Sequence, residues 1–370
     1  MVEWKKLGEV SNLVRGKVIS KDYIRDHGGS FPVYSSQTAN NGILGSIDSY
    51  MFDGNYLTWT TDGAYAGTIF RRNGKFNITN VCGLIDLNNS NINQDFLYYW
   101  LSLTAKNYVI EGMGNPKLMS NVASNIKIPI PSLDEQKRIV GILDTFTDSI
   151  ENLKQQIAQR RKQFEFYRDQ LLNVEGKPKE DIKMFGDYCT MIKGNGVQKT
   201  DFVDEGIGCI HYGQIYTHYG AFTYTTNKFV SKEVFEKAKK ASKGDIVMTD
   251  TSENVEDICK SVAYLGEEDI AVSNHALIIK HEQNPKFLSY STQTNSFFKQ
   301  KQKCAYGVKV TGIKPEHLAK FKMYLPSLPE QSRIVSILDT FEASISNLEA
   351  QLEQRQKQYE YYRNQLLTFE

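Results

Sequence analysis

The sequence has no apolar run that approaches the roughly 18 residues of a membrane-spanning helix. Its first residues, MVEWKKLGEV, contain no apolar stretch of the kind found in secretion signals. Five cysteines are scattered through 370 residues without a C-x-x-C pair. This usage is typical of reduced thiols and excludes a disulfide framework or a cysteine zinc site. We therefore expect a cytoplasmic protein that neither spans nor enters a membrane and holds no metal.

Familiar catalytic motifs are also missing. The stretch Gly194–Thr200 resembles a phosphate-binding loop, but Gln198 stands where that loop requires a glycine before its lysine. Asn115-Pro116 is followed by Lys117, not by the proline and aromatic residue that amino-methylating enzymes use to hold a base. None of the six histidines has zinc-ligand spacing, and His211 and His218 are best interpreted as loop or strand residues. We predict no catalytic residue and no cofactor in this chain.

The composition is that of an ordinary globular protein, with 40% hydrophobic and 24% charged residues, and the length suits two or three domains. A net charge of +1 conceals an uneven distribution. Residues 1–131 carry +2, residues 182–326 carry +3, and residues 327–370 carry −3. Mildly basic globular segments are compatible with nucleic-acid binding but do not establish it.

The strongest feature of the sequence is an internal repeat. Residues 131–172 recur as residues 326–367 at a constant offset of 195, with 28 of 42 positions identical and no gap. The same register joins Gly112–Leu118 to Gly307–Ile313, and the two halves open alike, with Leu7-Gly8-Glu9 and Phe185-Gly186-Asp187. Each half therefore consists of a variable globular segment followed by a repeated one. The predicted divisions are residues 1–131, 132–173, a linker at 174–180, 181–326 and 327–370.

The repeated segment is predicted to be a long helix. Ser132 and Glu135, like Ser327 and Glu330, have capping-box spacing, and Pro329 is compatible with a first turn. Apolar residues then follow steps of four and three, which indicates a coiled-coil seam. The predicted seam residues are Ile139, Leu143, Phe146, Ile150, Leu153, Ile157, Phe164, Tyr167 and Leu171, repeated as Ile334, Leu338, Phe341, Ile345, Leu348, Leu352, Tyr359, Tyr362 and Leu366.

Arg160 and Arg355 are the one polar position in this seam. Each helix has a length of roughly 60 Å. The simplest arrangement pairs the two helices antiparallel within one chain, with one globular domain at each end and a pseudo-twofold axis; pairing between chains is the alternative.

The globular segments both contain short alternating runs bounded by turn residues, which indicate strands. The fold class is therefore α+β, with two mixed α/β domains. Predicted strands cover residues 31–36, 42–45, 56–61, 67–72 and 76–80 in the first domain and 208–212, 244–249, 261–265 and 276–279 in the second. Predicted helices cover residues 94–104, 232–241 and 285–301.

Several loops combine amide, small polar and aromatic residues. Asn, Gln and Arg can make paired hydrogen bonds to base edges, and Ser, Thr, Lys and Tyr bind phosphates. Ordinary turn chemistry explains any one of these residues equally well, but as a group they favour DNA contact. The candidates are Tyr34, Gln37, Asn40, Asn41, Thr60, Thr61, Arg71, Arg72, Lys117, His211, Tyr212, Gln214, Thr251, Ser252, Asn254, Asn274, His275 and Lys309.

The whole chain resembles the specificity subunits of type I restriction–modification systems. The resemblance rests on Pro131–Gln136 with Arg138-Ile-Val140, and on their repeat, Pro326–Gln331 with Arg333-Ile-Val335. It implies that each globular domain is a target-recognition domain for one half of a bipartite, asymmetric DNA site. It also implies that the coiled coil sets the spacer between the half-sites.

The resemblance further implies that the partners are double-stranded DNA, two modification subunits and restriction subunits. S-adenosylmethionine, ATP and Mg²⁺ would then be bound by those subunits. Two other interpretations remain open. One is a coiled-coil adaptor with two protein-binding domains, which would lack salt-dependent DNA affinity. The other is the recognition part of a single-chain enzyme, which would need a catalytic domain that this chain lacks.

Overall fold

The computed structural model describes residues 2–111, 114–307 and 310–369. The chain forms two compact units, each made of one globular part and parts of two long helices. Unit 1 comprises Met1–Asn152 and Leu352–Glu370, and unit 2 comprises Leu153–Gln351. Contacts therefore group each globular part with segments of both helices. Within the described residues no helix is long and apolar enough to cross a membrane.

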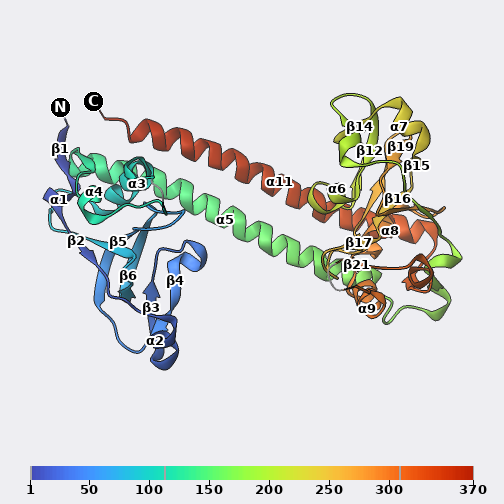
Figure 1. Ribbon diagram of the computed structural model, residues 1–370, viewed down its shortest axis with the longest axis horizontal. Coiled ribbons are helices and arrows are strands. Elements are labelled where there is room, and N and C mark those ends of the chain that lie inside the picture. The colour runs from blue at the N-terminus through green and yellow to red at the C-terminus, as the bar shows by residue number, and fades with distance from the viewer. Residues whose placement is uncertain (1, 112–113, 308–309, 370) are drawn as a thin grey trace. The chain divides into compact units, whose positions relative to one another are not determined.

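Unit 1 is built on a six-stranded sheet with the order β2-β7-β5-β6-β3-β4 (Figure 1). All neighbours are antiparallel except β3 and β6. The strands are β2 (Ser11–Arg15), β3 (Gly28–Tyr34), β4 (Ile43–Ile47), β5 (Phe52–Thr60), β6 (Ile69–Ile78) and β7 (Cys82–Leu87), and β1 (Glu3–Lys6) pairs separately with β8 (Lys127–Ile130). The short helices are α1 (Leu7–Val10), α2 (Lys21–Asp26) and α4 (Ser120–Ala123), with 3-10 turns at Ala39–Gly42 and Ala105–Tyr108.

The helix α3 (Gln94–Thr104) lies where the sequence predicts it, because Asn93 caps it by accepting hydrogen bonds from the backbone N–H groups of Asp95 and Phe96. Two predicted strands, 67–72 and 76–80, were wrong as separate elements. They form the single strand β6, because Gly74 pairs with Gly54 of β5 and does not form a turn between strands.

Unit 2 contains two five-stranded sheets with the orders β10-β20-β16-β18-β13 and β11-β14-β12-β19-β15. The strands of the first are β10 (Thr190–Lys193), β13 (Phe222–Thr223), β16 (Ile246–Thr249), β18 (Ser261–Tyr264) and β20 (Ala276–Lys280). Those of the second are β11 (Phe202–Val203), β12 (Ile207–Ile210), β14 (Lys228–Val230), β15 (Lys239–Ala241) and β19 (Ile270–Val272). Two further pairs join β9 (Ile182–Met184) to β22 (Lys322–Tyr324), and β17 (Thr251–Ser252) to β21 (Thr311–Gly312).

The helices of unit 2 are α6 (Tyr212–Thr217), α7 (Lys232–Lys237), α8 (Pro285–Ser291), α9 (Asn295–Cys304) and α10 (Pro315–Leu318), with 3-10 turns at Lys179–Asp181, Phe185–Asp187 and Lys199–Asp201. Two predicted helices are corrected. Where a helix was predicted over residues 232–241, the structure has the helix α7, which ends at Lys237, and then the strand β15, which pairs with β19. The predicted helix 285–301 is two helices, because Thr294 caps a new one by accepting from the N–H of Phe297.

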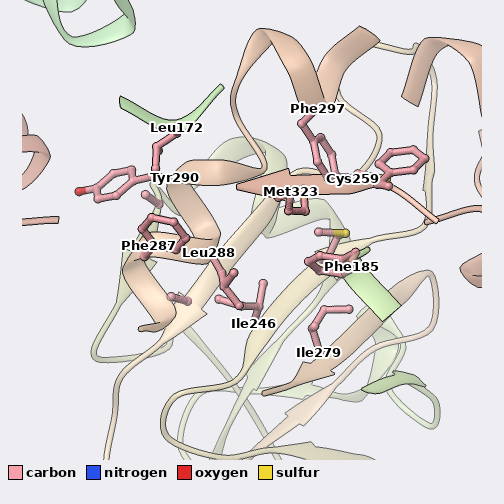
Figure 2. Packing of buried hydrophobic residues seen from close by; sticks show 14 of the residues in the cluster. Leu172, Phe185, Ile246, Cys259, Ile279, Phe287, Leu288, Tyr290, Phe297 and Met323 are labelled. Atoms are coloured by element: carbon pink, nitrogen blue, oxygen red, sulfur yellow. The ribbon is translucent and has the colours of Figure 1, made fainter. Parts of the chain in front are cut away.

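One hydrophobic cluster of unit 2 consists of aromatic and aliphatic side chains between α8, α9 and the first sheet. Phe287 and Tyr290 of α8 and Phe297 of α9 are buried in it together with Ile246 and Ile279 of the sheet, and Tyr290 extends its hydroxyl away from these two sheet residues (Figure 2). Leu172, at the end of the first long helix, joins the same cluster (Figure 2). The repeated helix is therefore part of the hydrophobic core of the globular part.

The two repeated segments form the helices α5 (Leu133–Leu172) and α11 (Leu328–Leu366), as predicted. Ser132 caps α5 by accepting from the N–H of Glu135. The other hydrogen bond of a capping box, from the N–H of Ser132 to the carboxylate of Glu135, was predicted wrongly. The carboxylates of Glu135 and Glu330 instead accept two hydrogen bonds each from Arg138 and Arg333, at 2.7 Å. Paired Arg–carboxylate contact is the stronger option for that side chain.

The helices pair antiparallel within each unit. In unit 1 the ring of Phe146 stacks on Tyr362, with centroids 5.3 Å apart, and Arg355 lies over the same Phe146 ring. In unit 2 the equivalent residues of the other copies meet, because Tyr167 stacks on Phe341, also at 5.3 Å, and Arg160 lies over Phe341. The single polar seam position therefore places its guanidinium over an aromatic ring in both units.

The seam residues range from buried to partly exposed. Ile139, Leu143, Ile334 and Leu338 are almost completely buried, whereas Tyr167 and Tyr362 keep 42% and 45% of their surface exposed. Burial is greatest where a globular part packs on the helix pair. The seam predicted from the sequence is thus tightest next to each domain.

The first residues of the two halves also make equivalent backbone hydrogen bonds, in keeping with their similar sequences. Leu7 and Gly8 donate backbone hydrogen bonds to the carbonyl oxygens of Ile126 and Ser124. Phe185 and Gly186 donate to those of Phe321 and Ala319. The acceptors in the two halves differ by the repeat offset of 195. One framework of backbone pairing therefore underlies both globular parts.

Candidate nucleic-acid interface

In unit 1 an exposed turn between β3 and β4 carries two of the predicted DNA contacts, Asn40 and Asn41. Both adopt positive φ angles, 49° and 52°, and Gly42 follows at 79°. Asparagine tolerates this left-handed backbone better than most residues, but two in succession are uncommon. Gln37 fastens the start of the turn by donating to the carbonyl oxygen of Ile43. The turn thus projects two amide side chains from a defined backbone.

The buried side chain of Arg72 packs against this turn and is hydrogen-bonded to it. The side chain is 3% exposed, and its guanidinium lies 3.6 Å from the centre of the Tyr34 ring. It donates to the carbonyl oxygen of Asn41 and to Thr58 Oγ1, while Nη2 has no partner among the described residues. Burial lowers the pKa of Arg72. Two predicted DNA contacts, Tyr34 and Arg72, are therefore placed to support the turn, and their buried side chains do not present a surface.

Thr60 and Thr61 lie at the end of β5 and are fully buried. Thr60 Oγ1 donates to the carbonyl oxygen of Tyr65, while Thr61 Oγ1 has no partner among the described residues. Lys117 lies next to this strand end. Leu118 donates its N–H to the carbonyl oxygen of Thr61, and the backbone of Lys117 forms an isolated antiparallel β-bridge with that of Asp62. Its counterpart in the repeat, Lys309, lies outside the described residues.

Arg71 points to the other face of β6 and is engaged with the helices. Its guanidinium pairs with Asp95 at 2.8 Å and with Asp144 of α5 at 3.2 Å, and it stacks over Tyr98 and Tyr99. This predicted DNA contact therefore joins the globular part of unit 1 to the repeated helix.

In unit 2 five predicted residues come together where the loop after β12 meets the loop after β19. His211 is buried and caps α6, because its Nδ1 accepts from the N–H of Gly213. Its ring lies 4.3 Å from that of Tyr212, and Tyr212 makes an edge contact with the exposed His275. Asn274 accepts from the N–H of Gly196, and Gln214 is buried and accepts from the N–H of His211.

Thr251, Ser252 and Asn254 lie in the segment that follows β16. Thr251 and Ser252 form β17 and are half-buried, and Asn254 is exposed and paired with Asp257. Asp250, directly before them, is 6% exposed; one carboxylate oxygen binds Lys193 at 3.1 Å and the other has no partner among the described residues. Asp250 and Thr61 occupy equivalent positions, because Ile313 and Leu118 donate to their carbonyl oxygens.

Each globular part is attached to its long helix by the same two residue types, a glutamine and an aspartate, to which the sequence analysis assigned no structural role. In unit 1, Gln136 accepts from the N–H of Asn93 and Asp144 accepts from the hydroxyl of Tyr99, at 2.7 and 2.6 Å. Asn93 caps α3, and both helix residues belong to α5.

In unit 2, Gln331 accepts from the N–H of Asn284 and Asp339 accepts from the hydroxyl of Tyr290, at 3.0 and 2.8 Å. We call each Gln–Asp pair a helix socket. The signal in the sequence was a glutamine and an aspartate kept in both copies of a seam helix, together with Asn-x5-Tyr in both variable segments.

A sequence model of the type I restriction modification DNA specificity domain matches residues 1–160 and 200–356. The chain belongs to this family. A putative type I specificity subunit of Mycoplasma pneumoniae is 31% identical over 98% of this chain and 97% of its own length. A second one from the same organism is 30% identical over 88% of this chain and 97% of its own length.

The fold is also shared with a solved S subunit of a type I restriction–modification system from M. genitalium. That structure has a TM-score of 0.60 and 14% identity, and the match covers 100% of this chain and 97% of that one. A second solved structure, from work on complex assembly and conformational transition of the type I system, has a TM-score of 0.61 and 16% identity over 99% and 96%.

As a member of the specificity family, the chain is a DNA specificity subunit of a type I restriction–modification system. The chemistry of the two loop regions suits that role. The exposed amide groups of Asn40 and Asn41 can both donate and accept, as base edges require. Burial lowers the pKa of His211, and the nearby Lys199 and His275 lower it further. A neutral His211 whose Nδ1 accepts from the backbone keeps its proton on Nε2. Among the described residues no cluster of His, Cys, Asp and Glu could hold a metal ion.

Proposed function

We propose that the two globular parts read different halves of one bipartite, asymmetric DNA site. The observation that carries this proposal is that two domains with unlike sheets are seated on identical helix sockets, Gln136 with Asp144 and Gln331 with Asp339. An identical attachment with a different reading surface is what a two-part, non-palindromic site requires. A protein that read a palindrome would be expected to repeat its reading surface as well.

In the first domain, the turn at Asn40 and Asn41 would contact base edges, with Tyr34, Gln37 and Arg72 positioning it. In the second domain, Tyr212, Asn274 and His275 would contact DNA, while His211 and Gln214 hold the loop. Thr251, Ser252 and Asn254 would lie beside that surface, and Lys117 would contact a phosphate. The support is that each group of exposed or half-buried side chains lies next to a buried, hydrogen-bonded residue, which fixes its geometry before DNA binds.

The paired helices would set the spacer between the half-sites and bind two modification subunits. The reactions themselves would belong to partner subunits in the cytoplasm. Modification subunits would bind S-adenosylmethionine, and restriction subunits would use ATP and Mg²⁺. The predicted segments 1–131, 132–173, 181–326 and 327–370 would then be reader, spacer, reader and spacer, joined by a linker at 174–180.

Methylome sequencing of cells that carry the system tests this proposal. Exchanging residues 181–326 for those of a relative with another second domain is expected to change one half-site and leave the other. A change in both half-sites would contradict independent reading.

Deleting one heptad from each helix, residues 149–155 and 344–350, is expected to shorten the spacer with both half-sites unchanged. A deletion in one helix alone is the matched control, because it breaks the seam register and is expected to abolish methylation. An unchanged spacer in the double deletion would contradict the spacer role.

A further inference from the structure

A short basic segment of the form Arg/Lys-Gly-x4-Lys recurs near the start of both halves of the sequence. It occupies residues 15–21 in the first half and residues 193–199 in the second, at an offset of 178. The same offset relates residues 7–9 to residues 185–187, so one register runs through both stretches without a gap. We call the two copies the glycine–lysine segments. The second copy overlaps the stretch that resembles a phosphate-binding loop but lacks the glycine before its lysine.

The glycine of each segment is required by the same close contact with neighbouring backbone. A side chain at Gly16 would collide with the carbonyl oxygen of Thr79, and one at Gly194 would collide with that of Ser273. Thr79 and Ser273 are themselves equivalent, because both donate their N–H groups to the last residue of the strand parallel to the one they follow, β3 in unit 1 and β12 in unit 2. The two segments are therefore fixed to the same place in the two globular parts, although the sheets differ elsewhere.

In unit 1 the glycine–lysine segment runs beside the turn between β3 and β4, which is proposed to contact base edges. The hydroxyl of Thr79, the residue beside the glycine of the segment, lies 3.2 Å from that of Ser35, where this turn begins. The segment ends at Lys21, the first residue of α2, and Ile24 of this helix packs on Gly45 of β4, the strand that follows the turn. Both ends of the segment are therefore next to the turn.

In unit 2 the segment runs beside the other surface that is proposed to contact DNA. Asn274, one of the residues of that surface, accepts a hydrogen bond from the N–H of Gly196 at 3.1 Å. Burial lowers the pKa of His211, and the positive charge of Lys199 lowers it further, which places this lysine close to the loop that follows β12. The two segments therefore border the two proposed DNA surfaces in the same way.

Each segment places an aliphatic side chain inward and its last lysine outward. Val197 is 1% exposed and packs with residues of the second sheet, and Ile19, at the same position of the other copy, is half-buried. Two residues further along the chain, Lys21 and Lys199 are both exposed. The glycine and the aliphatic residue fix the backbone, so the ammonium group of each lysine extends from a defined position.

The charge of both lysines is left available. The acidic residues nearest to them in the sequence have other partners, because Asp22 pairs with Arg25 at 2.8 Å and Asp201 accepts from the backbone N–H of Gln198 at 2.7 Å. Within the described part of the chain, neither Lys21 nor Lys199 forms an ion pair. Lysine binds phosphate as a point charge, and an exposed ammonium group without a carboxylate partner is suited to that contact.

We propose that Lys21 and Lys199 are equivalent contacts to DNA phosphates, which hold the backbone of the duplex beside each half-site in the same way while the neighbouring loops contact different bases. This inference rests on the proposed function and adds to it two residues that the sequence analysis did not select. Phosphate contacts position a protein on DNA but carry no sequence information. The same segment can therefore serve two domains whose base contacts differ.

The test uses the full chain assembled with the modification subunits of its system, and two duplexes, one with the site found by methylome sequencing and one with that site scrambled. DNA affinity is measured over a range of salt concentrations. Lys21→Ala and Lys199→Ala are each expected to weaken binding to both duplexes about threefold to tenfold, and to reduce the slope of log affinity against log salt by about 0.9. The double variant should lose about twice as much slope, with both half-sites unchanged in the methylome.

Two sets of variants serve as controls. Lys21→Arg and Lys199→Arg keep the positive charge and should keep the slope. Lys127 on β8 and Lys322 on β22 are also exposed and lie at equivalent positions of the repeat, but outside the glycine–lysine segments. Lys127→Ala with Lys322→Ala removes the same charge from both units and is expected to leave the slope unchanged.

The outcomes separate the two proposals. An unchanged slope in the Lys21→Ala, Lys199→Ala variant, or an equal loss in the Lys127→Ala, Lys322→Ala control, would overturn the phosphate contacts while the proposed function stands. A changed half-site in the methylome of either single alanine variant would overturn them as well, because it would identify that lysine as a base contact. Loss of a modification subunit from the double variant with an unchanged slope would identify a protein partner instead. An unaltered assembly that methylates no bipartite site would overturn the proposed function.

Discussion

The two units attach their globular parts to the helices in the same way but surround the attachment with different charges. In unit 1, Asp144 accepts from Tyr99 and pairs with Arg71, and Thr147 stands one turn further along the helix. In unit 2, Asp339 accepts from Tyr290 and pairs with Lys286 at 2.8 Å, and Glu342 takes the place of Thr147. Burial raises the pKa of Glu342, and the nearby Asp339 raises it further. The hydrogen bond from the tyrosine hydroxyl to the aspartate is thus the same in both units, while the residues around it differ.

Removal of the socket carboxylate should have the largest effect in either unit. Asp144→Ala leaves the hydroxyl of a completely buried tyrosine, Tyr99, with no charged acceptor, and Asp339→Ala does the same to Tyr290. An unsatisfied buried polar group costs about 1–3 kcal/mol, and the cost should be smaller in unit 1, where Thr147 Oγ1 lies 3.3 Å from the Tyr99 hydroxyl. Hydrogen exchange should therefore show faster exchange in α3 alone for Asp144→Ala and in α8 alone for Asp339→Ala.

The control for this pair of variants removes the hydroxyl as well. Tyr99→Phe in the Asp144→Ala background is expected to recover part of the loss, because no polar group is then left unpaired. Faster exchange in both units from either single change would show that the sockets do not act separately.

Residues 181–326, in the globular part of unit 2, contain no arginine, so replacement of Arg72 should affect unit 1 alone. Arg72→Met is expected to destabilise unit 1 by about 1–2 kcal/mol, because the stacking on Tyr34 and the hydrogen bonds to Asn41 and Thr58 are lost. Under the proposed function, methylome sequencing should show relaxed choice in one half-site. Arg72→Lys keeps the charge without the planar stacking and should give an intermediate result; relaxation of both half-sites would contradict the assignment.

The sequence allowed the parts of the fold that repeat to be predicted, because the molecule supplies its own comparison. The seam of α5 and α11, the register near Gly8 and Gly186, and the capped helix α3 all follow from spacing and identity. Elements without a repeat were harder. Strand β15 looks helical locally, and only its pairing with β19 makes it a strand. Tertiary pairing overrides local propensity in such short segments.

The candidate site was less predictable than the fold for a related reason. Residue type alone cannot separate a side chain that contacts DNA from one that supports it. Arg71 and Arg72 are adjacent and looked equivalent, yet they point to opposite faces of β6, one to α5 and one beneath the turn at Asn41. The contacts of the helix sockets could not be predicted, because nothing in the sequence shows that Gln136 binds Asn93, the cap of α3, and that Asp144 binds Tyr99.

The pH response should differ between the units, since the only histidine in residues 1–152 and 352–370 of the sequence is His27, which is exposed, whereas His211 of unit 2 is buried. Burial, Lys199 and His275 lower the pKa of His211, so the unfolded chain takes up the proton first as pH falls. The stability that neutral His211 allows is present above the ordinary pKa of about 6.5 and is lost as pH falls below it. His211→Asn keeps a capping acceptor and should remove up to about 1 kcal/mol of this acid sensitivity, measured by denaturant unfolding of unit 2. Unchanged acid sensitivity in this variant would place the responsible group elsewhere.

The smallest expected effect comes from exchanging the residues that differ beside the sockets. At neutral pH the ionised Glu342 is penalised by burial and by Asp339, so Glu342→Thr should stabilise unit 2 by less than about 1 kcal/mol, and Thr147→Glu should destabilise unit 1 by a similar amount. Because the folded pKa of Glu342 is raised, the wild type recovers stability as pH falls toward the ordinary carboxyl pKa of about 4.3, and the advantage of Glu342→Thr should shrink there. Denaturant unfolding at neutral and acid pH measures both effects. An advantage for Glu342→Thr that grew on acidification would mean that Lys286, which pairs with Asp339, outweighs burial at this position.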